Sequence, residues 1–139
     1  MKPIDLEEAF IIYKNALKEI VNNSFGWNEE FQKNRFLTRY DLNWFYWLEI
    51  DLKRIGYICM WQSKEEVHLS LIFILPEHQR KSYGKKVMNF LIKQAQEKNQ
   101  KITLSSFKLN KNAINFYQKL TFQVVKSDDH FIDLIFKPK

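Results

Sequence analysis

Residues 67–107 constrain the fold most strongly, because they join two strand patterns through a basic loop and an amphipathic helix pattern. The first strand pattern, VHLSLIFILP, sends Val67, Leu69 and Leu71 to one face and ends at Pro76. The helix pattern follows the loop, and KITLSSF at 101–107 is the second strand. A strand–helix–strand passage within a mostly antiparallel series predicts a mixed, twisted sheet.

The other patterns are helices and hairpins before and after this passage. A helix pattern starts after Asp5 and runs to Ile20, NNSFGW breaks it at 22–27, and Asn28 can cap a second helix. NWFYWLEI and IGYICMW predict one hairpin with its link at 51–54, and FQVVK and HFIDLIFK predict another around 127–129. A short helix opens at Asn110.

This order predicts an α/β (α+β) fold, in which a mixed, mostly antiparallel twisted sheet of about six to seven strands is flanked by about four helices. The chain has 139 residues, which suits a single domain over 1–139, because typical domains hold about 100–150 residues. A chain of this length folds without a metal or disulfide staple.

The chain is basic, with 22 Lys and Arg against 16 Asp and Glu and a net charge of +6. A positive balance favours an anionic ligand, either a nucleic acid or a phosphorylated small molecule. The basic residues are distributed along the chain, and no RNA-binding or helix-turn-helix signature accompanies them. We therefore expect no nucleic-acid partner.

Cysteine content and hydropathy indicate the compartment. The one cysteine, Cys59, lies in an apolar run and is interpreted as a small core residue. The longest apolar stretches are shorter than the ~20 residues of a membrane span, and residues 1–5 lead directly into a charged segment without a signal-peptide core. We expect a cytoplasmic protein with no membrane partner.

The loop PEHQRKSYG at 76–84 is a candidate anion site. It leads from a strand into the start of a helix, where unpaired amides and the helix dipole favour an anion. Gly84 permits close approach, and basic or amide side chains surround it. The spacing matches neither a Walker loop nor a Rossmann fingerprint. From these residues alone, a phosphate cradle and a solvated basic turn both remain open.

A second segment changes the interpretation. QRKSYG at 79–84, after IFILPE, resembles the acetyl-coenzyme A (acetyl-CoA) loop of the GNAT acetyltransferase superfamily, Gln/Arg-x-x-Gly-x-Gly/Ala. NKNAINFYQKLTF at 110–122 resembles that family's second signature, Asn-x-x-Ala-x-x-x-Tyr-x-x-x-Gly-Phe. Asn110, Ala113, Tyr117 and Phe122 fall in register, and Ile55-Gly56 resembles the family's apolar-Gly pair. The resemblance implies the acyl-CoA N-acyltransferase fold over essentially the whole chain.

Two residues depart from the family pattern. Ser82 stands where the first loop glycine is usual, and Thr121 stands where a glycine precedes Phe122. If these positions need a positive φ, each costs about 1–2 kcal/mol. The departures favour an alternative reading, a catalytically weak CoA-binding or regulatory module on the same scaffold.

The resemblance implies an N-acetyltransferase, an acyltransferase that moves the acetyl group of acetyl-CoA directly to a primary amine, without a metal. It implies that the backbone of Ile74 pairs with the pantetheine arm, that Asn110 contacts the pantetheine region, and that Tyr117 is the general acid. It further implies that the loop binds the pyrophosphate through Gln79, Arg80, Lys81, Ser82, Tyr83, Gly84 and Lys85.

The general base remains open between three alternatives. His68 lies on the central strand, where several family members carry a basic Glu or His, and its usual pKa of about 6.5 suits a base near neutrality. Glu66 lies on the same strand face and competes with it, and a base acting through water is the third alternative. A structural role for His68 also stands.

The acceptor site is expected in the segments before residue 62. Trp27, Glu30 and Tyr46 are the candidate residues, because an aromatic wall with acidic side chains suits an amine. The competing interpretation is that the aromatic residues complete the core. We expect a small-molecule or peptide amine as substrate, and the aromatic edges suggest a homodimer.

Overall fold

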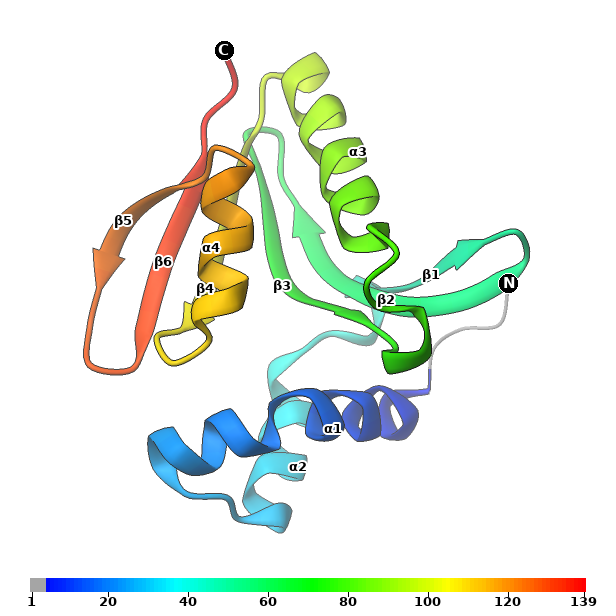
Figure 1. Cartoon of the computed structure of the whole chain (residues 1–139), viewed down its shortest axis with the longest axis vertical. Coiled ribbons are helices and arrows are strands. Elements are labelled where there is room, and N and C mark those ends of the chain that lie inside the picture. Colours follow the sequence, from blue (N-terminus) through cyan, green and yellow to red (C-terminus); the bar gives the residue numbers. More distant parts are fainter. Residues whose placement is uncertain (1–4) are drawn as a thin grey trace. The chain divides into compact units, whose positions relative to one another are not determined.

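The computed structural model describes residues 5–139, which form four α-helices and six strands in the predicted order (Figure 1). The bounds are α1 Leu6–Phe25, α2 Glu29–Arg39, β1 Phe45–Ile50, β2 Lys53–Gln62, β3 Glu66–Ile74, α3 Tyr83–Lys98, β4 Lys101–Phe107, α4 Lys111–Lys119, β5 Gln123–Ser127 and β6 Phe131–Phe136.

The strands form one six-stranded sheet in the order β1-β2-β3-β4-β6-β5. β3 and β4, the two strands that α3 connects, pair in parallel, with Glu66–Leu69 beside Lys101–Leu104. The pairs β1–β2, β4–β6 and β5–β6 are antiparallel. The sheet is therefore mixed, which confirms the prediction from residues 67–107.

The described chain divides into two compact units, and β2 and β3 each contribute to both. The first unit holds residues up to Cys59 together with Leu71–Gln79, and the second holds Met60–Ser70 and Arg80–Lys139. Each unit is described separately below.

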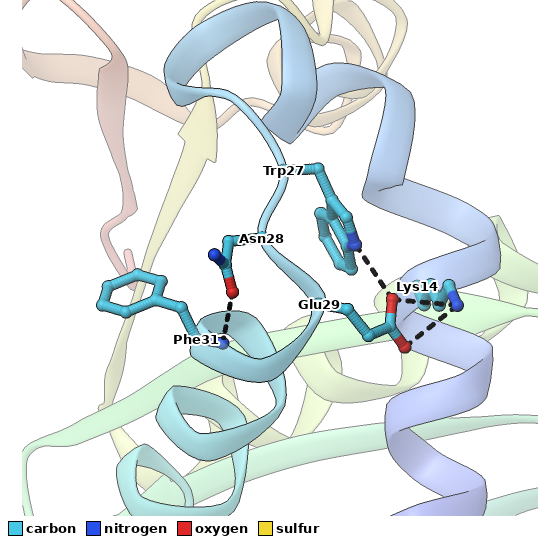
Figure 2. Close-up of polar contacts among 5 residues, drawn as sticks. All are labelled: Lys14, Trp27, Asn28, Glu29 and Phe31. Atoms are coloured by element: carbon cyan, nitrogen blue, oxygen red, sulfur yellow. Dashed lines mark hydrogen bonds and ion pairs between the residues drawn. The ribbon is translucent and has the colours of Figure 1, made fainter.

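The first unit begins with two helices that their own side chains cap. Asp5 accepts a hydrogen bond from the Glu7 amide at 2.8 Å, and Asn28 accepts one from the Phe31 amide at 2.9 Å (Figure 2). Acidic residues also follow in both first turns. The predicted break at Asn22 is wrong, because α1 continues to Phe25 and ends where Gly26 adopts a φ of 81°.

The core of the first unit is aromatic. Tyr57 is fully buried, and its hydroxyl donates to the Ala9 carbonyl at 2.9 Å, which ties β2 to α1. Cys59 is also fully buried in this cluster, as predicted for a core residue. Burial raises the pKa of the Cys59 thiol to about 12. The other buried members are Ala9, Phe10, Tyr13, Phe36, Phe45, Trp47 and Leu71.

The β1–β2 hairpin turns more tightly than predicted. Asp51 and Leu52 have φ values of 52° and 67°, and β2 already starts at Lys53. Two consecutive residues with positive φ are the geometry of a two-residue hairpin turn that matches strand twist. The expected four-residue link at 51–54 is therefore two residues long.

In the second unit, α3, β4 and β6 all contribute buried apolar side chains. Met88 and Ala95 of α3 and Ile102 of β4 have no exposed surface. Leu91, Leu104, Leu134 and Phe136 are also at least nine-tenths buried. β5 is the edge strand, and all five of its residues are exposed, including Val124 and Val125. Within residues 5–139, no helix is both long and apolar enough to cross a membrane.

Gly56 is required by a close backbone approach within the first unit. A Cβ at this position would lie 1.8 Å from the carbonyl oxygen of Phe73, which is backbone and cannot swing away. The neighbouring Ile55 carbonyl accepts a hydrogen bond from the Leu75 amide at 2.8 Å. Gly56 therefore lets β2 lie against the end of β3.

Gly56→Ala is expected to lower the free energy of unfolding by more than about 3 kcal/mol, because the added methyl group collides with backbone. Gly26→Ala is the matched control, because nothing lies within 4 Å of its added Cβ and only the positive φ opposes it. That control should lose about 1–3 kcal/mol. Urea denaturation of both variants measures the difference, and a smaller loss for Gly56→Ala would contradict the collision.

Candidate active site

The start of α3 differs from the starts of the other three described α-helices. Side chains of Asp5, Asn28 and Asn110 cap α1, α2 and α4, whereas Ser82 makes no side-chain cap hydrogen bond to α3. The first turn of α3 contains no acidic residue, and it carries Lys85 and Lys86. The lysines and the helix dipole at this start favour an anion.

The backbone before α3 is left-handed at two residues. Ser82 has a φ of 62°, so the conformation that a glycine would favour is present despite the serine side chain. Arg80 has a φ of 63°. The family pattern in the sequence did not predict a positive φ at this residue. The Lys86 amide donates to the Ser82 carbonyl at 3.1 Å, and the Lys86 ammonium lies 5.6 Å from the Tyr83 ring centre.

In the first unit, Ile74 and Gln79 contact each other directly. The Gln79 side-chain amide donates to the Ile74 carbonyl at 2.8 Å, across the short 3₁₀ turn Pro76–His78. Gln79, which is expected to bind the pyrophosphate, thus contacts the last residue of β3. The backbone of that residue, Ile74, is expected to pair with pantetheine. A carbonyl has two lone pairs, so this contact leaves the Ile74 carbonyl able to accept a second hydrogen bond.

In the second unit, His68 belongs to a hydrogen-bonded series. Its Nδ1 lies 2.8 Å from the hydroxyl of Thr103, and that hydroxyl donates to the Glu66 carboxylate. The Trp61 ring stacks on the imidazole, with 5.3 Å between ring centres and 25° between planes. The structure therefore joins the two competing base candidates through Thr103, a residue that the sequence analysis did not single out.

α4 carries Asn110 and Tyr117. The Asn110 side chain accepts a hydrogen bond from the Ala113 amide at 3.3 Å, so it caps the helix in addition to any contact with a ligand. Tyr117 is 8% exposed, and its ring contacts those of Phe116 and Phe122. Burial raises the pKa of Tyr117 to about 12, which keeps the phenol protonated at neutral pH.

The expected acceptor residues, which all belong to the first unit, differ in their contacts and exposure. Figure 2 shows Trp27 donating its indole N–H to Glu29 at 3.0 Å, and Lys14 pairing with the same carboxylate at 2.9 Å. These partners lower the pKa of Glu29. Glu30 is exposed in the next position of α2, and Tyr46 is 44% exposed on β1. Glu29, rather than Glu30, is therefore the carboxylate that contacts Trp27.

Most other aromatic residues of this region are core residues, which was the competing interpretation. A small hollow between α1 and α2 remains, and its lining is basic and aromatic instead of acidic. The lining residues are Tyr13, Gln32, Arg35, Phe36, Arg39 and Tyr40. Among the residues from 5 to 139, no group of three or more His, Cys, Asp and Glu side chains could hold a metal ion.

Comparison with known proteins gives a family and a fold. A family model described as the Acetyltransferase (GNAT) family matches residues 12–122. The structure is similar to the PaiA N-acetyltransferase of Thermoplasma acidophilum in complex with coenzyme A, with 17% identity, a TM-score of 0.67, and coverage of 98% of this chain and 96% of that one. A search of curated proteins found no match.

Two further solved structures show the same fold. One is the ribosomal-protein-S18-alanine N-acetyltransferase of Escherichia coli, with 19% identity, a TM-score of 0.64, and coverage of 99% and 90%. The other is Arabidopsis thaliana Naa50 in complex with the bisubstrate analogue CoA-Ac-MVNAL, with 14% identity, a TM-score of 0.60, and coverage of 90% and 93%. The chain belongs to the GNAT acetyltransferase family, and its mixed six-stranded sheet is the acyl-CoA N-acyltransferase fold.

Thr121, the second departure from the family pattern, has a φ of 73° at the end of α4. Thr121→Gly is expected to raise the free energy of unfolding by about 1 kcal/mol, because glycine removes the left-handed strain but adds freedom to the unfolded chain. Thr121→Ala is the matched control, because it removes the hydroxyl and keeps the strained φ. Thermal or urea unfolding compares the two, and an equal gain from alanine would show that φ is not the cause.

Proposed function

We propose that this protein is an N-acetyltransferase that moves the acetyl group of acetyl-CoA to a primary amine. The observation that carries the proposal is the uncapped, basic start of α3 in a chain of the GNAT family. When bound, acetyl-CoA supplies an acetyl thioester, which an amine nitrogen attacks directly. No covalent enzyme intermediate is needed, and the buried Cys59 is unsuited to form one.

The residues proposed to contact the cosubstrate belong to separate parts of the chain. Amides and side chains of residues 79–85 hold the pyrophosphate, where the α3 dipole and Lys85 favour negative charge. The backbone of Ile74 pairs with the pantetheine arm, and Asn110 contacts the pantetheine region. Gln79 supports the first of these contacts by fixing the Ile74 carbonyl.

The reaction requires a base and an acid. We assign His68 as the base that takes a proton from the amine nitrogen, and Tyr117 as the acid toward the departing sulfur. A C–N bond forms as the C–S bond breaks, and the thiolate receives its proton from the phenol or from water. Because burial raises the pKa of Tyr117 to about 12, its hydroxyl stays protonated and donates a hydrogen bond throughout the neutral range.

The acceptor is proposed to be a small-molecule or peptide amine. The structural relative Naa50 was solved with a peptide-bearing bisubstrate analogue, which supports a peptide amine as a candidate. A homodimer and a cytoplasmic location remain predictions.

Gly84→Glu is expected to abolish micromolar binding of acetyl-CoA, because a carboxylate in the first turn of α3 repels the pyrophosphate. Fold stability should hold, since acidic residues are favoured at helix starts. Asn89→Glu adds the same charge at an exposed position further along α3 and should bind normally. Calorimetric titration tests both variants, with dephospho-coenzyme A and ATP as comparison ligands. Absence of binding by the unmodified protein at millimolar ligand would instead indicate a scaffold that has lost its cosubstrate.

Tyr117→Phe is expected to lower kcat by about 10²–10⁴-fold and to leave the KM for acetyl-CoA nearly unchanged. The ring and its contacts with Phe122 are retained, so only the hydroxyl is lost. A screen of amines for release of free thiol identifies a substrate, and the rate of thiol release with that substrate gives kcat and the KM for acetyl-CoA. Binding of acetyl-CoA together with an unchanged kcat would exclude the acid role, and binding without any turnover would favour the CoA-binding module.

A further inference from the structure

We propose that Thr103 is a positioning residue that holds His68 in the tautomer able to accept a proton at Nε2, and that Glu66 acts through Thr103. His68, Thr103 and Glu66 then form one hydrogen-bonded series, in which His68 is the base. Glu66 supports the base and is not an alternative to it. The inference rests on the proposed function, because it assigns a role in amine deprotonation, but the hydrogen-bond order can be tested without it.

Strand register brings the three residues together. His68 of β3 and Thr103 of β4 are direct partners in the parallel ladder, so their side chains share a face. Glu66 lies two residues before His68 and therefore on that same face. All three are half-buried, which reduces competition from water for their hydrogen bonds.

The chemistry of the acceptors fixes the direction of each hydrogen bond. An ionised carboxylate can only accept, so the single proton of the Thr103 hydroxyl goes to Glu66. The Thr103 oxygen must then act as acceptor toward His68 at 2.8 Å, and the proton between them belongs to Nδ1. In a neutral imidazole this leaves Nε2 as the acceptor nitrogen.

Trp61 fixes the remaining freedom of the ring. Its indole lies nearly parallel to the imidazole, at 25° and 5.3 Å between centres. Thr103 holds the ring edge and Trp61 holds a ring face, so both the rotation and the tilt of the imidazole are restrained. A base positioned in this way meets its substrate with little reorganisation.

The series also compensates the charge that forms on His68. When Nε2 takes the amine proton, the imidazole becomes a cation that keeps its Nδ1 hydrogen on Thr103. The Glu66 carboxylate is linked to the imidazole through the Thr103 hydroxyl, and its negative charge balances the positive charge of the ring. The proton then leaves Nε2 to water, which restores the neutral ring.

The first test is a long-range ¹H–¹⁵N NMR spectrum of the full-length protein without ligands. The chain has three histidines, and His78→Gln and His130→Gln assign their signals. We expect the Nδ1–H tautomer for His68, a shift toward Nε2–H in Thr103→Val, and its return in Thr103→Ser. An Nε2–H tautomer in the unmodified protein would overturn the proposal.

The matched control is Ser105→Ala. Ser105 lies two residues further on β4, and its hydroxyl donates to the Asp133 carboxylate. This variant removes a hydroxyl–carboxylate contact from the same strand without touching the His68 series, so the His68 signals should not move. An equal change of tautomer in Ser105→Ala and Thr103→Val would assign the effect to the strand as a whole and reject Thr103.

The second test is kinetic. Thr103→Val should lower kcat about 10- to 100-fold with an unchanged KM for acetyl-CoA, because a hydrogen bond to a group that becomes charged is lost. Thr103→Ser should restore most of the rate. Glu66→Gln should lower kcat as well, and the double variant should add little to Thr103→Val, because both changes break one series. Independent, additive losses would overturn the series.

The two proposals can fail separately. If no amine is acetylated but the tautomer behaves as expected, the function is wrong and the positioning of His68 stands. If amines are acetylated and Thr103→Val retains full kcat, the function stands and Thr103 has no role in positioning the base.

Discussion

Parallel pairing between β3 and β4 is the constraint on which the rest of the second unit depends. Antiparallel strands can be joined by two residues, as β1 and β2 are at Asp51 and Leu52, but parallel strands need a crossover. α3 is that crossover, and it can begin only after β3 has ended at Ile74. The same pairing places His68 beside Thr103. One topological requirement thus produces both the helix start that suits an anion and the contact that orients the candidate base.

The four α-helices of the described chain differ in how their N-termini are capped. α1, α2 and α4 satisfy their first amides with their own side chains, and α1 and α2 add acidic residues that complement the dipole. α3 has neither a side-chain cap nor an acidic first turn, and two left-handed residues precede it. These features cost stability in the protein alone. They are consistent with a site whose missing negative charge comes from a ligand.

Much of the fold could be predicted from the sequence, because the helices, strands and caps depend on local sequence patterns. Hydrophobic period predicted the element order, the caps Asp5 and Asn28 were placed correctly, and the family motifs indicated positive φ at Ser82 and Thr121. The end of α1 was misjudged, because Asn22 to Phe25 have weak helix propensity. The helix nevertheless continues to Phe25 and ends at Gly26, whose amide donates to the Asn22 carbonyl. The contacts of Gln79 with Ile74 and of Thr103 with His68 were not predictable, since they depend on how a loop closes and on strand register. Register between parallel strands joined by a long crossover leaves no local trace in the sequence.

The burial of Cys59 has a consequence for thiol chemistry around the protein. A GNAT acetyltransferase that turns over as proposed releases coenzyme A, a free thiol, beside itself at every cycle. Thiol–disulfide exchange needs an accessible thiolate, and Cys59 offers neither access nor an ionised sulfur, with its pKa near 12. The folded protein is therefore inert toward its own product and toward oxidised forms of it. Reactivity of this one cysteine reports instead on opening of the aromatic core, which makes it an internal probe of local unfolding.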